Sequence, residues 1–327
     1  MKFRTLGQQG FEVSEVGLGC WQLGGDWGQD FDQQQTFSIL DAALDNGVSF
    51  LDTADVYGGG KSEKLIGQFL QQSGQQPKIA SKFGRGGDVF PDKYSEQALR
   101  DGVEASIERL GVSSLDLLQL HCVPTQVLRD GEIFEWLRKL KQQGVIQHFG
   151  ASVETVEEGL ICLEQEGLLS LQVIFNLYRQ KLVNELLPQA KEKGVGIIVR
   201  LPLASGLLSG KFSVDTRFGQ SDHRNFNQNG ECFNVGETFA GLPFIKGVEL
   251  TEQLKQYAPE GYSMAQLALR WILDHDAVST IIPGASSAVQ AKANAAISEL
   301  PALDADLHQS LSDFYHTQVH QHIRGQY

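Results

Sequence analysis

Apolar runs of strand length alternate with longer amphipathic segments along most of the chain. The runs are nearly continuous in valine, isoleucine and leucine, which is typical of strands buried on both faces of a parallel sheet. They predict strands at residues 15–18, 48–52, 78–82, 115–121, 146–151, 171–175, 196–200 and 277–282. The amphipathic segments predict helices at residues 34–46, 61–71, 95–110, 129–143, 155–166, 182–193, 263–275 and 287–298. Eight strand–helix units in succession favour an α/β fold of the closed (β/α)8 type, a TIM barrel, and leave an open doubly wound sheet as the alternative.

Three segments lie outside this repeat. Residues 2–13 predict an N-terminal hairpin around a turn at residues 7–10. Residues 201–260 form a long irregular stretch after the seventh strand, and a loop of that length in a compact domain is usually a lid or a binding loop. Residues 304–324 predict an extra C-terminal helix. Because no low-complexity linker divides the chain, residues 1–327 are predicted to form a single domain.

The charge balance and the cysteine content narrow the class of protein. Forty acidic against 27 basic residues give a formal net charge of −13, which argues against nucleic acid or an anionic membrane as a general partner. The four cysteines show no C-x-x-C spacing and fit a reducing compartment. The sequence shows no apolar signal segment and no apolar run near the roughly 18 residues of a membrane span. We therefore expect a cytoplasmic protein, whose oligomeric state the sequence does not indicate.

Polar residues end several of the predicted strands, and in a parallel barrel these ends share the edge where ligands bind. They are Asp52, Lys82, His121, Ser152 and Arg200, with Tyr57 shortly after the second strand. A buried lysine is costly unless it is paired, so we expect Asp52 to neutralise Lys82. A protonated Lys82 beside Tyr57 would lower the pKa of the phenol from about 10 and make it a general acid. These groups can protonate an oxygen but cannot supply a hydride, so they would need a redox cofactor.

The same stretches resemble the aldo-keto reductase superfamily over nearly the whole chain. The matching segments are VGLGCW at 16–21, FLDTA at 50–54 with Tyr57-Gly58 and Ser62-Glu63, Ser81-Lys82, LDLLQLH at 115–121, GAS at 150–152, GLLSGK at 206–211 and IIPGA at 281–285. Each is weak alone, but their order and spacing are specific. The resemblance implies a (β/α)8 barrel that reduces aldehydes or ketones with NADPH, or catalyses the reverse oxidation. It implies that Tyr57 is the general acid, that Lys82 and Asp52 lower its pKa, and that His121 orients the carbonyl.

The resemblance also implies a cofactor site. Gly19, Cys20 and Trp21 match residues beside the nicotinamide, with Asp52 below it, and Ser152 and Gln172 match those that hold its carboxamide. The pyrophosphate would pass Leu201, Leu203 and Ser205, next to Gly206 and Lys211 of the matching segment. The adenosine half would lie along residues 284–294, which include Gly284, Ser286, Gln290 and Asn294.

Departures from the family pattern affect both ends of this cofactor site. Val153 replaces a common asparagine, and Arg200 stands where many members stack a tyrosine on the nicotinamide, although a guanidinium plane can also stack. Gly284 and Gln290 replace a lysine and an arginine that bind the 2′-phosphate of NADPH in many members. The start of the last barrel helix could still hold a phosphate. The resemblance to the family therefore favours NADP(H) as the cofactor, and NAD(H) is the alternative.

The substrate is expected to be a small carbonyl or alcohol. Trp21, Trp27, Phe83 and Phe90 are expected on loops at the open end of the barrel, where they would line a pocket with Tyr57 and His121. Such aromatic groups suit an aldehyde or a sugar-like ring, and ordinary packing is the alternative for Trp27 and Phe90. No metal site is predicted, because no ligand set completes the terminal histidines at 316, 320 and 322.

Three functions stay open at this point. The first is a nicotinamide-dependent carbonyl reductase with Tyr57 as the proton donor. The second is a nucleotide-binding regulatory protein on the same barrel with little turnover, since fold does not fix function. The third is a barrel enzyme that uses Lys82 as a Schiff-base amine.

Overall fold

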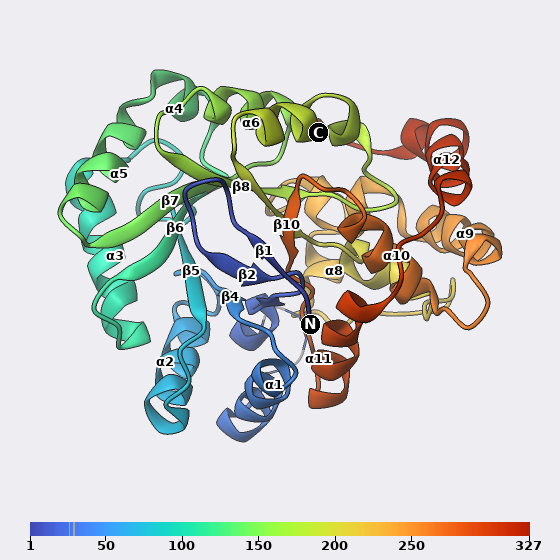
Figure 1. Cartoon of the computed structure of the whole chain (residues 1–327), viewed down its shortest axis with the longest axis horizontal. Coiled ribbons are helices and arrows are strands. Elements are labelled where there is room, and N and C mark those ends of the chain that lie inside the picture. The colour runs from blue at the N-terminus through green and yellow to red at the C-terminus, as the bar shows by residue number, and fades with distance from the viewer. Residues whose placement is uncertain (26, 29) are drawn as a thin grey trace.

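The computed structural model describes residues 1–25, 27–28 and 30–327. An eight-stranded parallel sheet forms its centre, and strands that follow one another in the chain are neighbours in the sheet. The strands are β3 (Leu18–Gly19), β4 (Phe50–Asp52), β5 (Lys78–Phe83), β6 (Leu115–His121), β7 (Ile146–Ser152), β8 (Leu168–Ile174), β9 (Gly196–Arg200) and β10 (Val278–Ile281). Parallel bridges from Val16 to Ile281 and from Gly19 to Gly284 join the first strand to the last, so the sheet closes into a barrel (Figure 1). The predicted (β/α)8 fold is confirmed, and the open sheet is excluded.

Helices surround the barrel (Figure 1). They are α1 (Gln33–Asp45), α2 (Lys61–Ser73), α3 (Glu96–Leu110), α4 (Thr125–Asp130), α5 (Glu132–Gln142), α6 (Val156–Leu163), α7 (Leu186–Glu192), α10 (Met264–Leu273) and α11 (Ala288–Ala295). The single helix expected at 129–143 is wrong, because Gly131 adopts φ 76° and separates α4 from α5. This left-handed conformation is the one that glycine adopts without strain at a helix end.

The inside of the barrel changes from apolar to polar along the strands. Phe50, Ala80, Leu117 and Ile198 form an apolar cluster with residues of the N-terminal hairpin, β1 (Phe3–Thr5) and β2 (Glu12–Ser14). Residues two apart on a strand point to the same side. Two positions further along these strands stand Asp52, Lys82, Gln119 and Arg200. The apolar layer therefore supports a polar layer at the opposite end from the hairpin.

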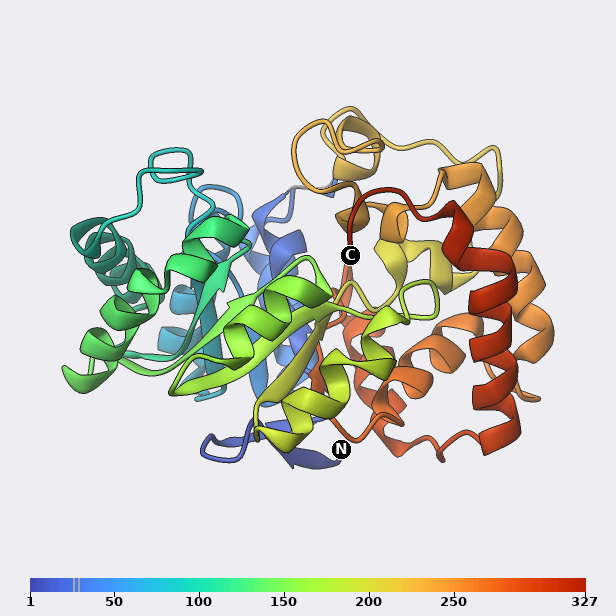
Figure 2. The same ribbon diagram turned by 90° about the horizontal axis from the view of Figure 1, so that it is seen from above.

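The segment after β9 is less irregular than expected. It contains two helices, α8 (His223–Phe226) and α9 (Phe244–Leu254). The expectation of a loop through residue 260 is therefore wrong for its last part, where an apolar face that includes Phe244, Val248 and Leu254 is buried. The irregular part lies at the end of the barrel opposite the hairpin (Figure 2).

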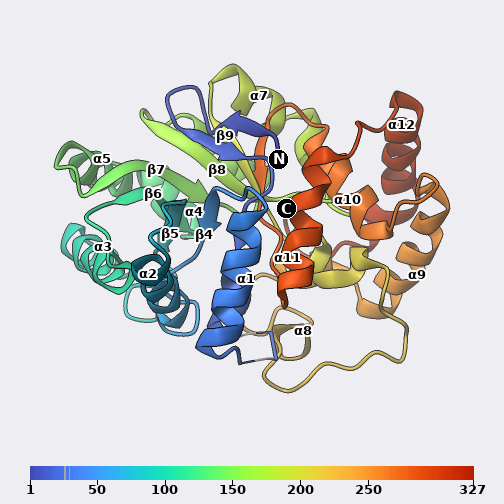
Figure 3. The same ribbon diagram turned by 60° about the horizontal axis from the view of Figure 1, so that its bottom comes forward.

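The C-terminal helix α12 (Ala305–Phe314) continues through short turns at Tyr315–Val319 and His320–His322. It lies beside α9 on one flank of the barrel, away from α1 and α2 (Figure 3). No helix within the described ranges is both long and apolar enough to cross a membrane.

Candidate active site

Three of the four predicted catalytic residues are joined by hydrogen bonds at the polar end of the barrel. Lys82 Nζ donates to Asp52 Oδ1 at 2.5 Å and to Tyr57 Oη at 3.2 Å. A third bond of 2.7 Å runs from Lys82 Nζ to the backbone oxygen of Thr53. Lys82 is 1% exposed and Asp52 is 2% exposed. All three ammonium protons therefore have partners, and the buried charge has a counterion.

Two glutamines hold the second oxygen of Asp52. Gln119 Nε2 donates to Asp52 Oδ2 at 2.8 Å, and Gln172 Nε2 donates to the same oxygen at 2.7 Å. All three side chains are buried. Sequence reasoning misses Gln119, although a glutamine inside an apolar strand is a signal of a buried polar partner. The two glutamines fix the carboxylate that in turn fixes Lys82.

Burial decides whether the pKa of Tyr57 lies above or below that of a free phenol. Desolvation raises this pKa above its ordinary value of 10.0, although Lys82 acts in the opposite direction. The expectation that Tyr57 would titrate below a free phenol is therefore wrong, since the sequence does not show how completely the hydroxyl is desolvated. Burial alone would lower the pKa of Lys82, but Asp52 raises it above 10.5. At neutral pH the pair consists of a protonated phenol and an ammonium group.

His121 completes the predicted set of four. Its ring centroid lies 5.9 Å from that of Tyr57, and the two rings meet edge-on at 86°. Burial lowers the pKa of His121 well below 6.5, and the positive charges of Arg85 and Lys82 add to this effect. The imidazole is therefore neutral at pH 7, with one nitrogen that donates and one that accepts. Its Nδ1 is buried and has no hydrogen-bond partner in the described part of the chain.

An aromatic wall lies on the other side of Tyr57. The Trp21 ring stacks on Tyr57 with centroids 6.0 Å apart, and Phe233 lies 6.1 Å from Trp21. Trp27 packs edge-on against Trp21 at 5.4 Å and carries the Arg224 guanidinium on its ring at 5.1 Å. Trp21 thus lies where a substrate residue is expected, and Trp27 supports it. Sequence reasoning misses Phe233, because nothing local distinguishes it from other loop residues.

Of the other two aromatic residues expected in the pocket, Phe83 lies elsewhere. Phe83 packs on α3, since a Cβ placed on Gly102 would lie 2.8 Å from its ring. The reason is the alternation of side chains along β5, because Lys82 points into the barrel and its neighbour must point out. Phe90 is 41% exposed on the loop after β5. The prediction that Phe83 lines the pocket is therefore wrong, whereas that for Phe90 stays a prediction.

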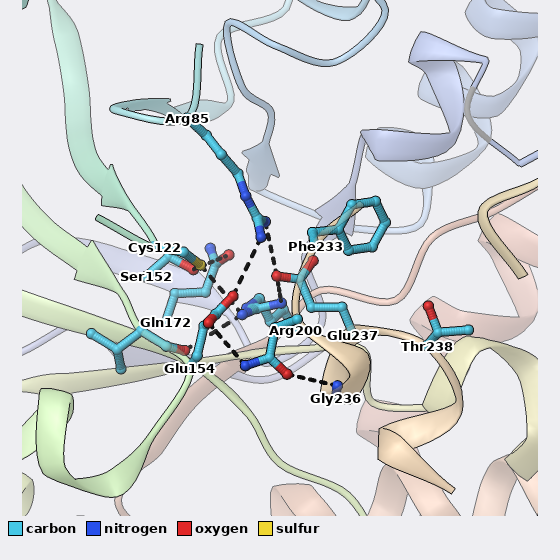
Figure 4. Close-up of polar contacts among 12 residues, drawn as sticks. Arg85, Cys122, Ser152, Glu154, Gln172, Arg200, Phe233, Gly236, Glu237 and Thr238 are labelled. Carbon is cyan, nitrogen blue, oxygen red and sulfur yellow. Dashed lines mark hydrogen bonds and ion pairs between the residues drawn. The ribbon is translucent and has the colours of Figure 1, made fainter. Parts of the chain in front are cut away.

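Buried ion pairs link the long loop to the barrel, and sequence reasoning misses them except for Arg200 (Figure 4). Arg85 Nη1 donates to Glu237 Oε1 at 2.8 Å, and Arg85 Nη2 donates to Glu154 Oε1 at 3.3 Å. Arg200 Nη1 lies 3.6 Å from the same Glu237 oxygen. Asn234 Nδ2 donates to Glu154 Oε2 at 2.9 Å. The two arginines hold the pKa of Glu237 at about 2 against the effect of burial, whereas burial raises the pKa of Glu154 to about 7.

The residues at the nicotinamide end fit that cofactor. Ser152 Oγ donates to Gln172 Oε1 at 3.4 Å, and both side chains are buried. A carboxamide offers donors and an acceptor, which the serine hydroxyl and the glutamine oxygen can match. Arg200 Nη2 donates to the Val153 backbone oxygen at 3.4 Å, and Arg200 Nε is buried without a partner among the described residues. Gly19 also has a structural reason to be glycine, since a Cβ there would lie 2.6 Å from the Ile282 oxygen.

The backbone after β9 is strained where the pyrophosphate is expected. Leu201 has φ 50°, Ser205 has φ 54° and Gly206 has φ 97°. Left-handed conformations outside glycine cost about 1–3 kcal/mol each and cluster at functional sites. Ser205 Oγ donates to the Glu237 backbone oxygen at 3.0 Å, so this turn is tied to the long loop. Leu203, within the turn, is partly buried, and Lys211, which follows the turn, is exposed.

The four residues expected near adenosine lie around α11, with Gly284 and Ser286 before it and Gln290 and Asn294 within it. Gln290 Oε1 accepts from Ser286 N at 2.8 Å and from Ser286 Oγ at 2.9 Å. Asn294 Nδ2 donates to the Gly284 backbone oxygen at 3.1 Å. The amide of Ser286, a donor available to a phosphate, is thus occupied by Gln290, and neither Gly284 nor Gln290 carries a cation.

One set of possible metal ligands lies in the same region. Cys122, Glu154 and Glu237 place one ligand atom each within 4.8 Å of one another. Arg85 and Arg200 already pair with these carboxylates. A divalent cation would meet two guanidinium groups there, so the cluster is better described as an ion-pair network.

Comparison with known proteins agrees with this geometry. The family model described as "Aldo/keto reductase family" matches residues 15–315. The chain is 31% identical to "Probable aldo-keto reductase 1" of Glycine max over 286 residues, which cover 85% of this chain and 79% of the relative. It is 28% identical to the "NADH-specific methylglyoxal reductase" of Escherichia coli over 324 residues, 94% of this chain and 96% of that one. Among solved structures, the glycerol dehydrogenase AKR11B4 of Gluconobacter oxydans superposes with a TM-score of 0.80 at 28% identity, covering 99% and 98% of the two chains.

These matches extend over nearly the whole barrel rather than one motif. They include the strand ends that carry Asp52, Lys82 and His121. The chain therefore belongs to the aldo-keto reductase family and is an NAD(P)H-dependent oxidoreductase.

Proposed function

We propose that this protein reduces an aldehyde or ketone to the alcohol, with Tyr57 as the proton donor. The observation that carries the proposal is the contact of the buried Lys82 with both Asp52 and Tyr57. A bound nicotinamide would supply the hydride to the carbonyl carbon. The protein must then place the carbonyl, deliver one proton to its oxygen and stabilise the charge left behind.

Tyr57 gives its proton to the developing alkoxide, and the phenolate that remains lies 3.2 Å from the Lys82 ammonium group. Asp52 keeps Lys82 charged, because it supplies the buried counterion. The neutral His121 can donate a hydrogen bond to the carbonyl oxygen and so orient it toward Tyr57. Ser152, Gln172 and Arg200 would hold the nicotinamide, the turn at 201–206 would face the pyrophosphate, and the start of α11 would face the adenosine.

Cofactor preference is the finer part of the proposal. Family habit favours NADP(H), whereas Gly284 and Gln290 offer no cation to a 2′-phosphate. A relative of this chain is named as NADH-specific. We propose that NADP(H) binds without the usual cation pair and that NAD(H) binds in the same site. Fluorescence titration with each cofactor in turn measures the ratio of the two dissociation constants.

The test of Tyr57 is its replacement by phenylalanine. Tyr57→Phe should lower kcat by roughly 10²–10⁴-fold, the range of general acid catalysis, and leave the cofactor dissociation constant within about twofold. Tyr178→Phe is the matched control, because Tyr178 is a buried tyrosine whose hydroxyl bonds to Thr251 and to the Gly247 backbone oxygen of α9. Full turnover in Tyr57→Phe would remove the assigned role.

The same assay separates the other two functions. Tight cofactor binding with no turnover over a broad panel of carbonyls would replace the enzyme by a nucleotide-binding regulatory protein. Borohydride trapping of substrate on Lys82 would support the Schiff-base alternative, and a failure to trap removes it. A cytoplasmic location and a small carbonyl or alcohol as partner remain predictions from the sequence.

A further inference from the structure

Arg85 lies in a ring of side chains around the catalytic groups. It follows Lys82 by three residues, and its guanidinium lies over the Phe233 ring at 5.4 Å. Phe233 contacts Trp21, which stacks on Tyr57, and Tyr57 meets His121. Arg85 is also the charged group that lowers the pKa of His121 most strongly. Arg85 therefore lies at the edge of the aromatic wall, and its partners Glu154 and Glu237 lie within 4.8 Å of Cys122, the residue that follows His121.

Carboxylates fix this guanidinium and balance its charge. Glu237 and Glu154 accept from Arg85 at 2.8 and 3.3 Å, and Glu237 also lies 3.6 Å from Arg200. Two cations thus face two acidic residues, so the cluster is close to neutral when both carboxylates are ionised. Because its charge is balanced in this way, Arg85 attracts an anionic substrate less than an unpaired guanidinium would.

The partly exposed residues of this ion-pair cluster are Arg85, which donates hydrogen bonds, and Glu154, which accepts them. The Arg85 side chain is 19% exposed and that of Glu154 is 21% exposed, whereas that of Glu237 is 5% exposed. Arginine has five N–H donors, of which the bonds to Glu237 and Glu154 use two. A hydroxyl group donates and accepts at the same time, so it can bond to both partners. A carboxylate only accepts, and above pH 7, where Glu154 is ionised, it would meet the negative charges of both Glu154 and Glu237.

We propose that Arg85 and Glu154 are specificity-determining residues that bind a hydroxyl group next to the reacting carbonyl. They select neutral hydroxylated carbonyls over carboxylated ones. Glu237 is a positioning residue that holds Arg85 from the long loop. The proposal rests on the proposed reductase function.

Three two-carbon aldehydes test it, since they differ only in the group beside the carbonyl. The group attached to the aldehyde carbon is a hydroxymethyl in glycolaldehyde, a methyl in acetaldehyde and a carboxylate in glyoxylate. The wild-type protein should show kcat/KM, corrected for hydration of each aldehyde, at least about tenfold higher for glycolaldehyde than for acetaldehyde, because the methyl group of acetaldehyde would cover the exposed donor and acceptor without bonding to either. Glyoxylate should be the poorest of the three. Equal values for glycolaldehyde and acetaldehyde, or glyoxylate as the best substrate, would overturn the proposal without any variant.

Two variants separate recognition from structure. Arg85→Met keeps the aliphatic part of the side chain and should lower kcat/KM for glycolaldehyde at least about tenfold more than for acetaldehyde, so that the ratio of the two values falls toward one. Glu154→Gln keeps the shape and removes the charge that Glu154 carries above pH 7, so at pH 8 it should raise kcat/KM for glyoxylate about tenfold, as expected when one repulsive charge is lost. An equal loss with all three aldehydes in Arg85→Met, together with no gain for glyoxylate in Glu154→Gln, would show a structural role only.

The outcome also separates this proposal from the reductase function. Turnover of acetaldehyde that depends on Tyr57, without a preference for glycolaldehyde, would refute the hydroxyl site and keep the reductase. No turnover of any of the three aldehydes, or of a wider panel, by the cofactor-bound protein would refute both.

Discussion

Replacing Asp52 by asparagine should destabilise the protein more than any exposed ion pair could. Asp52 Oδ1 accepts from Lys82, and Oδ2 accepts from Gln119 and Gln172. An asparagine of the same shape has one oxygen and one NH2 group. The NH2 group must therefore face either the Lys82 ammonium group or the two glutamine donors, and one set of buried donors loses its acceptor.

The magnitude follows from burial. Asp52 and Lys82 are 2% and 1% exposed, so solvent does not screen their interaction. Removing one partner of a buried ion pair typically costs about 3–5 kcal/mol, because the remaining charge is uncompensated. Lys82 would avoid part of that cost by losing its proton, which lowers its pKa. Turnover should fall by about 10² or more, because a neutral Lys82 does not stabilise the Tyr57 phenolate.

Urea unfolding and a second replacement test this reasoning. Asp276→Asn is the control, since Asp276 pairs with Lys191 and both side chains are more than half exposed. It should cost less than about 1 kcal/mol. The double variant Asp52→Asn/Lys82→Met should recover part of the lost stability, because it removes the unpaired charge, but none of the turnover. A cost for Asp52→Asn as small as the control's, or a double variant less stable than either single one, would refute the argument.

Three other measurements address separate parts of the structure. Burial raises the pKa of Asp55 from 3.8 to about 7. Folding therefore favours the protonated carboxyl group, and the protein loses stability as pH rises from about 4 to 7. Asp55→Asn should leave the free energy of unfolding in urea unchanged relative to wild type near pH 4 and raise it by about 1–4 kcal/mol at pH 8. Arg324 donates hydrogen bonds to backbone and side-chain oxygens at both ends of residues 228–242. Arg324→Lys should therefore speed limited proteolysis of that segment by at least about tenfold. An unchanged rate would show that Arg324 does not hold the segment in place. Gly284→Lys with Gln290→Arg should tighten NADPH by about tenfold and leave NADH unchanged, and equal gains for both cofactors would show that no 2′-phosphate site had formed.

The sequence predicts the strand-borne part of the site well, for a physical reason. Asp52, Lys82 and His121 each end an apolar run, and a parallel barrel brings all such ends together whatever the details of packing. The same alternation could have placed Phe83 correctly, because the residue next to an inward Lys82 on a strand points outward. The pKa of Tyr57 could not be predicted in this way, since its direction depends on how much water reaches the hydroxyl group.

The ion pairs among Arg85, Glu154 and Glu237 could not be predicted from the sequence. Arg85, Glu154 and Glu237 lie on three separate connecting segments, and the closest two are 69 positions apart in the chain. Charged loop residues are common, and only the folded structure shows which of them meet. No spacing rule joins residue 85 to residue 237.

The two halves of the site therefore differ in how they are held. The proton-donating groups stand on barrel strands, and a single buried carboxylate orders Lys82 and two glutamines. The proposed recognition groups depend on Glu237, which the long loop carries and which Ser205 and Arg324 help to hold through the same loop. Loss of a loop contact should therefore change which carbonyl is accepted before it changes the proton transfer. A variant such as Arg324→Lys that alters the ratio of glycolaldehyde to acetaldehyde, while kcat for acetaldehyde stays constant, would show this separation directly.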